Sequence, residues 1–209
     1  MSQGAIVDVC GAPRMSLAEW ADLSEDEPGE LVDGRLEEEE VASAAHEVVT
    51  GSMLRAVGNW LVPQGGLVLG SSAKYAVKPP GRGRMADVSA FFPGSRMPPR
   101  AGIITTPPDI AIEVVSPSPR DGRRDRVEKL KEYAAFGIRW YWVIDPALRS
   151  LEILELGADR RYVHALDMTD GVIEDVPGCN GLRLDLDALW AEVDRLGPEE
   201  DPSSKNDGE

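Results

Sequence analysis

The stretch Ile138–Asp145 reads IRWYWVID, a dense run of aromatic and β-branched residues. Both of its alternating sets of side chains are largely apolar, with Trp140 and Trp142 on one face and Tyr141 and Val143 on the other. A strand that is apolar on both faces is typical of a sheet covered on both sides. We therefore expect this strand at the centre of a β-sheet, with its aromatic side chains in the core rather than on a surface that stacks nucleic-acid bases.

The preceding residues 122–136 have the period of a charged amphipathic helix. We expect Val127, Leu130 and Tyr133 on its inward face. Gly137 then follows, a typical residue at the end of a helix. This helix is expected to flank the sheet.

Capping and turn signals outline the rest of a mixed α/β (α+β) fold, a β-sheet flanked by helices with additional β-hairpins. Ser16–Glu19 is a capping-box pattern for a short helix, and Ser43 is a typical N-cap for a helix that continues to about Leu61. Asp33-Gly34 is a strong hairpin signal, with strands on both sides and the second continuing to Val41. Further strands are expected at 67–69, 74–78, 86–92, 109–115, 150–156, 161–166, near 172–176 and at 182–186, followed by a closing helix at 187–196.

The composition, 42% hydrophobic and 28% charged in 209 residues, is typical of a globular protein and excludes a fibrous or largely disordered chain. No apolar run approaches the roughly 20 residues of a membrane span, and the N-terminus lacks the pattern of a signal peptide. Cys10 and Cys179 lie far apart without metal or redox spacing, so we expect a cytoplasmic protein. We expect a flexible N-terminus over 1–15, a single domain over 16–196 and a disordered acidic tail over 197–209.

The formal net charge of −15 is concentrated in two segments. Residues 22–40 have a net charge of −9 and residues 187–209 of −6, whereas residues 41–186 between them have +1. A strongly acidic surface would oppose a polyanionic substrate. Because the central part of the chain is nearly neutral, the overall charge does not exclude such a substrate.

Two acidic residues stand out, since the chain has no Gly-rich phosphate loop, Ser nucleophile elbow or zinc-type Cys/His cluster. Asp87 lies near the start of one expected strand, and Glu113 lies inside the nearly unbroken apolar run 110–115. A buried carboxylate must be paired, protonated or bound to a cation. If the two strands are neighbours, the acids would form a site of hard oxygen ligands suited to Mg²⁺ or Mn²⁺. The alternative is that each acid pairs with an arginine.

The motifs around these acids resemble a known family. They run from Glu30-Leu31-Val32-Asp33-Gly34 through the block EVVSPS at 113–118 to the block YWVIDP at 141–146. Over about residues 16–193 the sequence resembles the Uma-two family of putative restriction endonucleases, within the PD-(D/E)XK nuclease superfamily. The last two blocks together are specific, whereas either alone would be weak. The resemblance implies a restriction-endonuclease-like core, in which a mixed β-sheet is flanked by helices.

The resemblance also implies the residues of an active site. Asp87 and Glu113 would be catalytic residues that bind the metal, and Lys129 would be the motif lysine. Glu30 matches a family glutamate of the same site, and His46 matches a family histidine. A structural role for His46, capping or packing at the start of its helix, stays open as the alternative to a catalytic one.

Two positions depart from the superfamily pattern. Ala86 stands where proline usually precedes the aspartate, and Val115 occupies the usual position of the lysine. The resemblance implies that the lysine lies on the next helix, which favours Lys129, since a long side chain reaches from a packed helix to a strand end. Lys131 is the alternative, at a more solvent-facing position.

The implied reaction is hydrolysis of a DNA phosphodiester bond assisted by Mg²⁺ or Mn²⁺. Arg84, Arg120 and Arg124 are the expected contacts to backbone phosphates, and the alternative for the basic residues at 120–131 is a solvated helix face. Two other functions stay open: a catalytically inactive nuclease-fold protein with an interaction or regulatory role, and a metal-dependent hydrolase of RNA or nucleotides. We expect no membrane partner. A homodimer stays open, because proteins of related fold often act as dimers.

Overall fold

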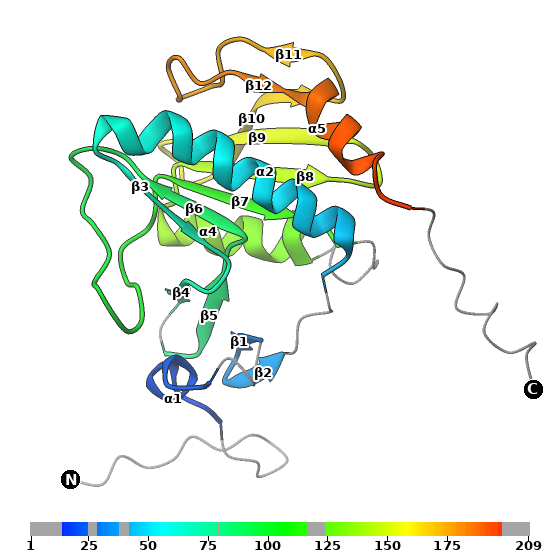
Figure 1. The fold of residues 1–209 in the computed structure, drawn as a ribbon. Coiled ribbons are helices and arrows are strands. Elements are labelled where there is room, and N and C mark those ends of the chain that lie inside the picture. Colours follow the sequence, from blue (N-terminus) through cyan, green and yellow to red (C-terminus); the bar gives the residue numbers. More distant parts are fainter. Residues whose placement is uncertain (1–13, 25–28, 38–41, 79, 117–123, 198–209) are drawn as a thin grey trace, which may run out of the picture.

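The computed structural model describes residues 14–24, 29–37, 42–78, 80–116 and 124–197, which form a mixed α+β fold (Figure 1). The helices are α1 (Leu17–Ala21), α2 (Ala44–Leu61), α4 (Leu130–Phe136) and α5 (Leu186–Val193), with a 3₁₀ turn η1 (Val62–Gln64) and a π-helical turn η2 (Arg124–Lys129). The strands are β1 (Glu30–Val32), β2 (Arg35–Glu37), β3 (Leu67–Gly70), β4 (Lys74–Lys78), β5 (Arg82–Met85), β6 (Val88–Phe91), β7 (Ile110–Val114), β8 (Trp140–Asp145), β9 (Ser150–Leu156), β10 (Tyr162–Met168), β11 (Val172–Ile173) and β12 (Leu184–Asp185).

The central sheet has six strands in the order β10-β9-β8-β7-β6-β3. Only the β7–β8 pair is parallel, and every other neighbouring pair of this sheet is antiparallel. Strand β8 lies inside the sheet and is buried along its whole length, from Trp140 to Asp145. The prediction that the aromatic stretch forms a central strand is therefore confirmed.

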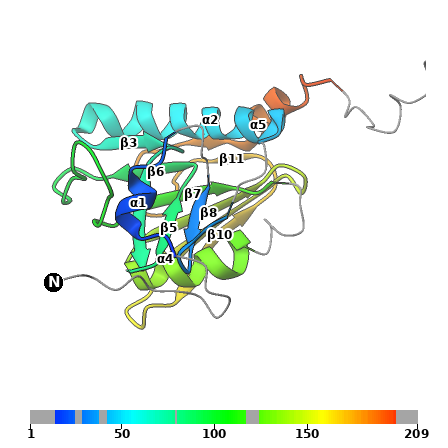
Figure 2. The ribbon, with the colours of Figure 1, turned by 90° about the horizontal axis from the view of Figure 1, so that it is seen from below.

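Helices cover both faces of this sheet (Figure 2). On one face, α2 and α5 pack against a core that includes Ile110 and Ile112 of β7. On the other face, α4 packs against a second core, which includes Ala111 and Val115. Because side chains alternate along a strand, Glu113 lies on the α4 face of β7.

A smaller sheet, in the order β2-β1-β5-β4, lies beside the lower part of the central sheet in Figure 1. Its β1–β2 hairpin turns at Asp33-Gly34, as predicted, and both residues adopt positive φ. Leu31 of β1 pairs with Gly83 of β5. This pairing brings the hairpin against the strand that carries Arg82 and Arg84.

Gly83 has no room for a side chain, because an added Cβ would lie 2.2 Å from the ring of the fully buried Trp20. We expect Gly83→Ala to lower the free energy of unfolding by about 1–3 kcal/mol through overpacking. Urea denaturation measures the loss. Gly58→Ala in α2 is the control, because nothing lies within 4 Å of its added Cβ. Equal stability of the two variants would contradict the packing of Trp20 on β5.

Most predicted boundaries agree with the structure, including the capping box at Ser16 and the cap of α2 at Ser43. Three differ: no strand was expected at 82–85, where β5 lies; the described part of the helix expected over 122–136 comprises η2 and α4; and Val127 is exposed rather than inward. Residues 1–13, 38–41 and 198–209 lie outside the described ranges. None of the helices in the described ranges has the length and apolar character needed to cross a membrane.

Candidate active site

Asp87 lies directly before β6 and contacts the neighbouring strand β7. In the antiparallel ladder Val88 pairs with Ile112. One step further along this ladder, Asp87 comes level with Glu113. The backbone N–H of Val114 donates to Oδ2 of Asp87 over 2.7 Å. The two strands are therefore neighbours, and the Asp87 carboxylate lies beside the part of β7 that carries Glu113.

His46 approaches the same carboxylate from the first turn of α2. Its backbone N–H donates to the Ser43 side chain over 3.2 Å, which begins the helix at this point. The buried imidazole Nε2 lies 3.4 Å from Oδ2 of Asp87. Within the described ranges, both protein contacts of Asp87 fall on Oδ2. This makes the other oxygen, Oδ1, the candidate ligand atom of Asp87.

Glu113 is buried and receives two donors from the α4 side of the sheet. The Lys129 ammonium donates to Oε2 over 2.8 Å, and the Tyr133 hydroxyl donates to Oε1 over 2.5 Å. Burial and the neighbouring Glu113 carboxylate raise the pKa of Tyr133 well above its usual value, so Tyr133 stays protonated and acts as a donor. Lys131, the alternative to Lys129, is exposed.

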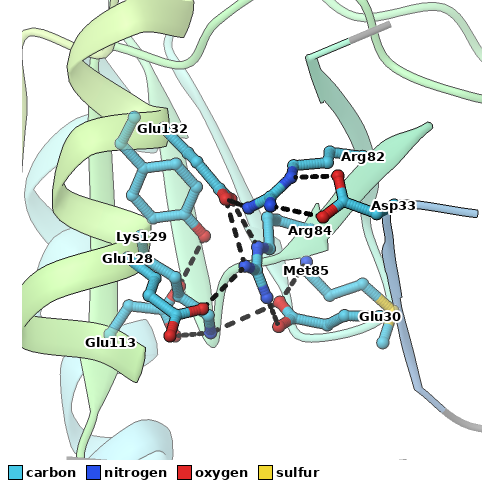
Figure 3. A network of polar contacts seen from close by, with 10 residues as sticks. Glu30, Asp33, Arg82, Arg84, Met85, Glu113, Glu128, Lys129 and Glu132 are labelled. Atoms are coloured by element: carbon cyan, nitrogen blue, oxygen red, sulfur yellow. Dashed lines mark hydrogen bonds and ion pairs between the residues drawn. The ribbon is translucent and has the colours of Figure 1, made fainter. Parts of the chain in front are cut away.

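Glu30 lies on the other side of Lys129 (Figure 3). It is fully buried in β1, and its Oε1 accepts the backbone N–H of Met85 over 3.0 Å. The same oxygen lies 3.3 Å from the Lys129 ammonium. Its second oxygen, Oε2, accepts a hydrogen bond from Nη1 of Arg84 over 2.6 Å. Lys129 is thus held between two carboxylates, those of Glu30 and Glu113.

The structure corrects the role expected for Arg84. This side chain is fully buried, and its Nε donates to Oε2 of Glu132 over 2.6 Å. Burial disfavours its charged form, but the Glu30 and Glu132 carboxylates outweigh this and raise its pKa. A guanidinium enclosed in this way does not reach a DNA phosphate. Of the other expected phosphate contacts, Arg120 and the side chain of Arg124 lie outside the described parts of the structure.

Arg82 extends the network to the β1–β2 turn. Its Nε and Nη2 donate to the two Asp33 oxygens over 2.9 and 2.8 Å, and its Nη1 contacts Glu132. Hydrogen bonding to Asp33 raises the pKa of Arg82 and lowers that of Asp33. The network therefore joins α4 to both β1 and β5.

The sequence analysis missed the parts played by Glu132, Tyr133 and Arg82, although two spacings pointed to them. Glu132 and Tyr133 follow Lys129 by three and four residues, which places all three on one helix face. Arg82 and Arg84 are two residues apart on a strand, which directs both to one face of it. Such spacings show which residues are neighbours but not which opposing strand they meet.

The donor set of Asp87 and Glu113 fits a hard divalent cation. A carboxylate oxygen can accept more than one contact, so the donors Lys129 and Tyr133 do not prevent Glu113 from binding a cation. Within the described ranges, no cluster of three or more Asp, Glu, His or Cys side chains is placed to hold a metal. Mg²⁺ is commonly bound by one or two carboxylates together with water and substrate phosphates. Two carboxylates therefore suffice for such a cation.

Comparisons with known proteins agree with this architecture. The model of the Uma2 family, described as "Putative restriction endonuclease", matches residues 16–187. A crystal structure of "a putative nuclease belonging to DUF820 from Anabaena variabilis ATCC 29413" is similar with a TM-score of 0.65 and 16% sequence identity, over 85% of this chain and 98% of that chain. No match is found among curated proteins. The predicted family resemblance and fold class are confirmed.

Proposed function

Because this chain belongs to the Uma2 family, described as putative restriction endonucleases, we propose that it is a metal-dependent endonuclease that hydrolyses DNA phosphodiester bonds. Its family and fold are those of a restriction-endonuclease-like nuclease. The observation that supports the proposal most is the Lys129–Glu113 contact of 2.8 Å on the strand that also binds Asp87 through Val114. An aspartate, a glutamate and a lysine from distant parts of the chain are thereby gathered at one strand end.

Asp87 and Glu113 would hold Mg²⁺ or Mn²⁺ through their carboxylate oxygens. When bound, such a cation lowers the pKa of a water ligand and offsets charge on the phosphoryl oxygens. The backbone N–H of Val114 and the imidazole of His46 hold Oδ2 of Asp87 and so fix the direction of Oδ1. In this role His46 orients a metal ligand rather than reacting itself.

Lys129 supplies the positive charge that the protein itself brings to the reaction. Its ammonium orients the attacking water and offsets the negative charge that develops on the phosphate. Glu30 and Glu113 hold Nζ from two sides at 3.3 and 2.8 Å. Tyr133 fixes the second oxygen of Glu113. A fixed ammonium needs no rearrangement when charge develops.

We expect the purified protein to nick supercoiled plasmid DNA with Mg²⁺ or Mn²⁺ and to lose this activity in excess chelator. Linear DNA and single-stranded RNA, incubated in parallel, identify the substrate class. Cleavage of RNA alone would contradict the DNA assignment and favour an RNA hydrolase. Absence of cleavage on every substrate, with the metal bound as shown by calorimetry, would contradict the nuclease proposal and favour an interaction protein.

A further inference from the structure

The Lys129 ammonium belongs to a closed ring of four side chains, which are Lys129, Glu30, Arg84 and Glu132 (Figure 3). Nζ of Lys129 contacts Oε1 of Glu30, whose Oε2 accepts from Arg84. Arg84 in turn donates to both oxygens of Glu132, over 2.6 and 3.3 Å. Glu132 follows Lys129 by three residues in the η2–α4 segment, so one turn of backbone closes the ring.

We propose that Arg84 and Glu132 are positioning residues that fix Glu30 and, through it, the ammonium of Lys129; their importance for catalysis rests on the proposed function. Their effect on the site passes through Glu30 and Lys129.

Because the ring is buried, the position of the Lys129 ammonium depends on the other side chains of the ring. Arg84 and Glu30 are fully buried, Lys129 is 2% exposed and Glu132 is 8% exposed. Water therefore does not replace a partner that is lost. A lysine ammonium is a point charge on a flexible four-carbon stem, whereas the arginine fork imposes a direction on each carboxylate that it binds. The rigid member of the ring, Arg84, thus sets the position of the flexible one.

Weakening Arg84 changes the balance of charge at both carboxylates that it binds, Glu132 and Glu30. Glu132 also contacts Arg82, so it retains a cationic partner without Arg84. Glu30 keeps the Lys129 ammonium, 3.3 Å from its Oε1, as a cationic partner. We expect the ammonium then to move toward Glu30 and away from Glu113.

The test uses Glu132→Gln, which keeps the shape of the side chain but removes its charge, and Arg84→Lys, which keeps the charge but removes the fork. Acylation of lysines by a succinimidyl acetate, followed by peptide mass spectrometry, reports the exposure of Lys129 in the whole protein. We expect Lys129 to react about tenfold faster in both variants. The displaced ammonium makes a weaker charge-assisted hydrogen bond to Glu113 and is therefore held less firmly in the site. The exposed Lys131 is the internal reference and is expected to react at an unchanged rate.

Glu152→Gln is the matched control for a general loosening of this helical segment. Glu152 contacts Arg126 of η2, outside the ring. We expect the reactivity of Lys129 to stay unchanged in this control. An equal increase in Glu152→Gln, or unchanged reactivity in both ring variants while thermal unfolding shows them folded, would overturn the proposal.

Cleavage kinetics separate this inference from the proposed function. In an active enzyme, Glu132→Gln should lower kcat about tenfold with KM for DNA unchanged, and should add little to the loss caused by Lys129→Met. Additive losses would indicate a structural role and would overturn the positioning role. A further outcome is that the unmodified protein cleaves no substrate while the labelling of Lys129 changes as expected in the variants. That result would support the positioning of Lys129 by the ring and would contradict the nuclease assignment.

Discussion

Asp87→Asn is expected to reduce metal-dependent cleavage about 1,000-fold while leaving the fold intact. Loss of an outer partner of a metal ligand typically costs 10- to 100-fold, and loss of the ligand's own charge should cost more. The asparagine side-chain oxygen still accepts the Val114 N–H that holds Asp87 at 2.7 Å. Initial rates of plasmid nicking over a series of Mn²⁺ concentrations measure the loss, and calorimetry measures the accompanying loss of metal affinity.

Asp109→Asn is a matched control for this variant. Asp109 lies at the other end of the β6–β7 pair and likewise accepts a backbone N–H, that of Phe92, over 2.6 Å. It makes no contact with the site in the part of the chain that the structure describes. We expect this control to cleave at the unmodified rate. Full activity in Asp87→Asn would show that the metal is held elsewhere, or that a contaminating nuclease produced the signal.

The fold was largely predictable because its signals are local. Ser43 caps α2, Asp33-Gly34 turns the first hairpin, and the doubly apolar stretch at 138–145 marks the centre of the sheet. Strand β5 was missed because its sequence, RGRM, alternates arginine with glycine and has no apolar periodicity. Its strand character comes from pairing with β1 and β4, which depends on contacts across the chain.

The sequence predicted several residues of the site but not the contacts between them. Glu113 stood out because an acid inside an apolar strand needs a partner, and that partner is Lys129. Arg84 was misassigned because a sequence does not show whether an arginine faces solvent or an internal carboxylate. Its environment is set by Glu30 and Glu132, which lie 54 and 48 residues away along the chain. Whether an arginine faces solvent or pairs with carboxylates inside the protein therefore depends on residues that are distant in the sequence.

Arg84→Met is expected to lower the free energy of unfolding by about 3–5 kcal/mol, because it removes the buried guanidinium that balances part of the charge of the Glu30 and Glu132 carboxylates. Urea denaturation measures the loss, and an unchanged slope with urea concentration shows that the unfolding reaction is the same. Arg139→Met is the control, since Arg139 and Glu155 form an exposed pair, with exposed fractions of 65% and 38%. Exposed pairs contribute little, so this control should change stability hardly at all.

The double variant Arg84→Met/Glu132→Leu distinguishes the loss of a charge balance from the loss of packing. Removing both members of a buried ion pair is often far less costly than removing one. We therefore expect the double variant to recover about half or more of the stability lost in Arg84→Met. Additive losses in the double variant would show instead that the two side chains stabilise the protein by packing. A loss below about 1 kcal/mol in Arg84→Met would contradict the enclosed network itself, because that is the value typical of a pair exposed to solvent.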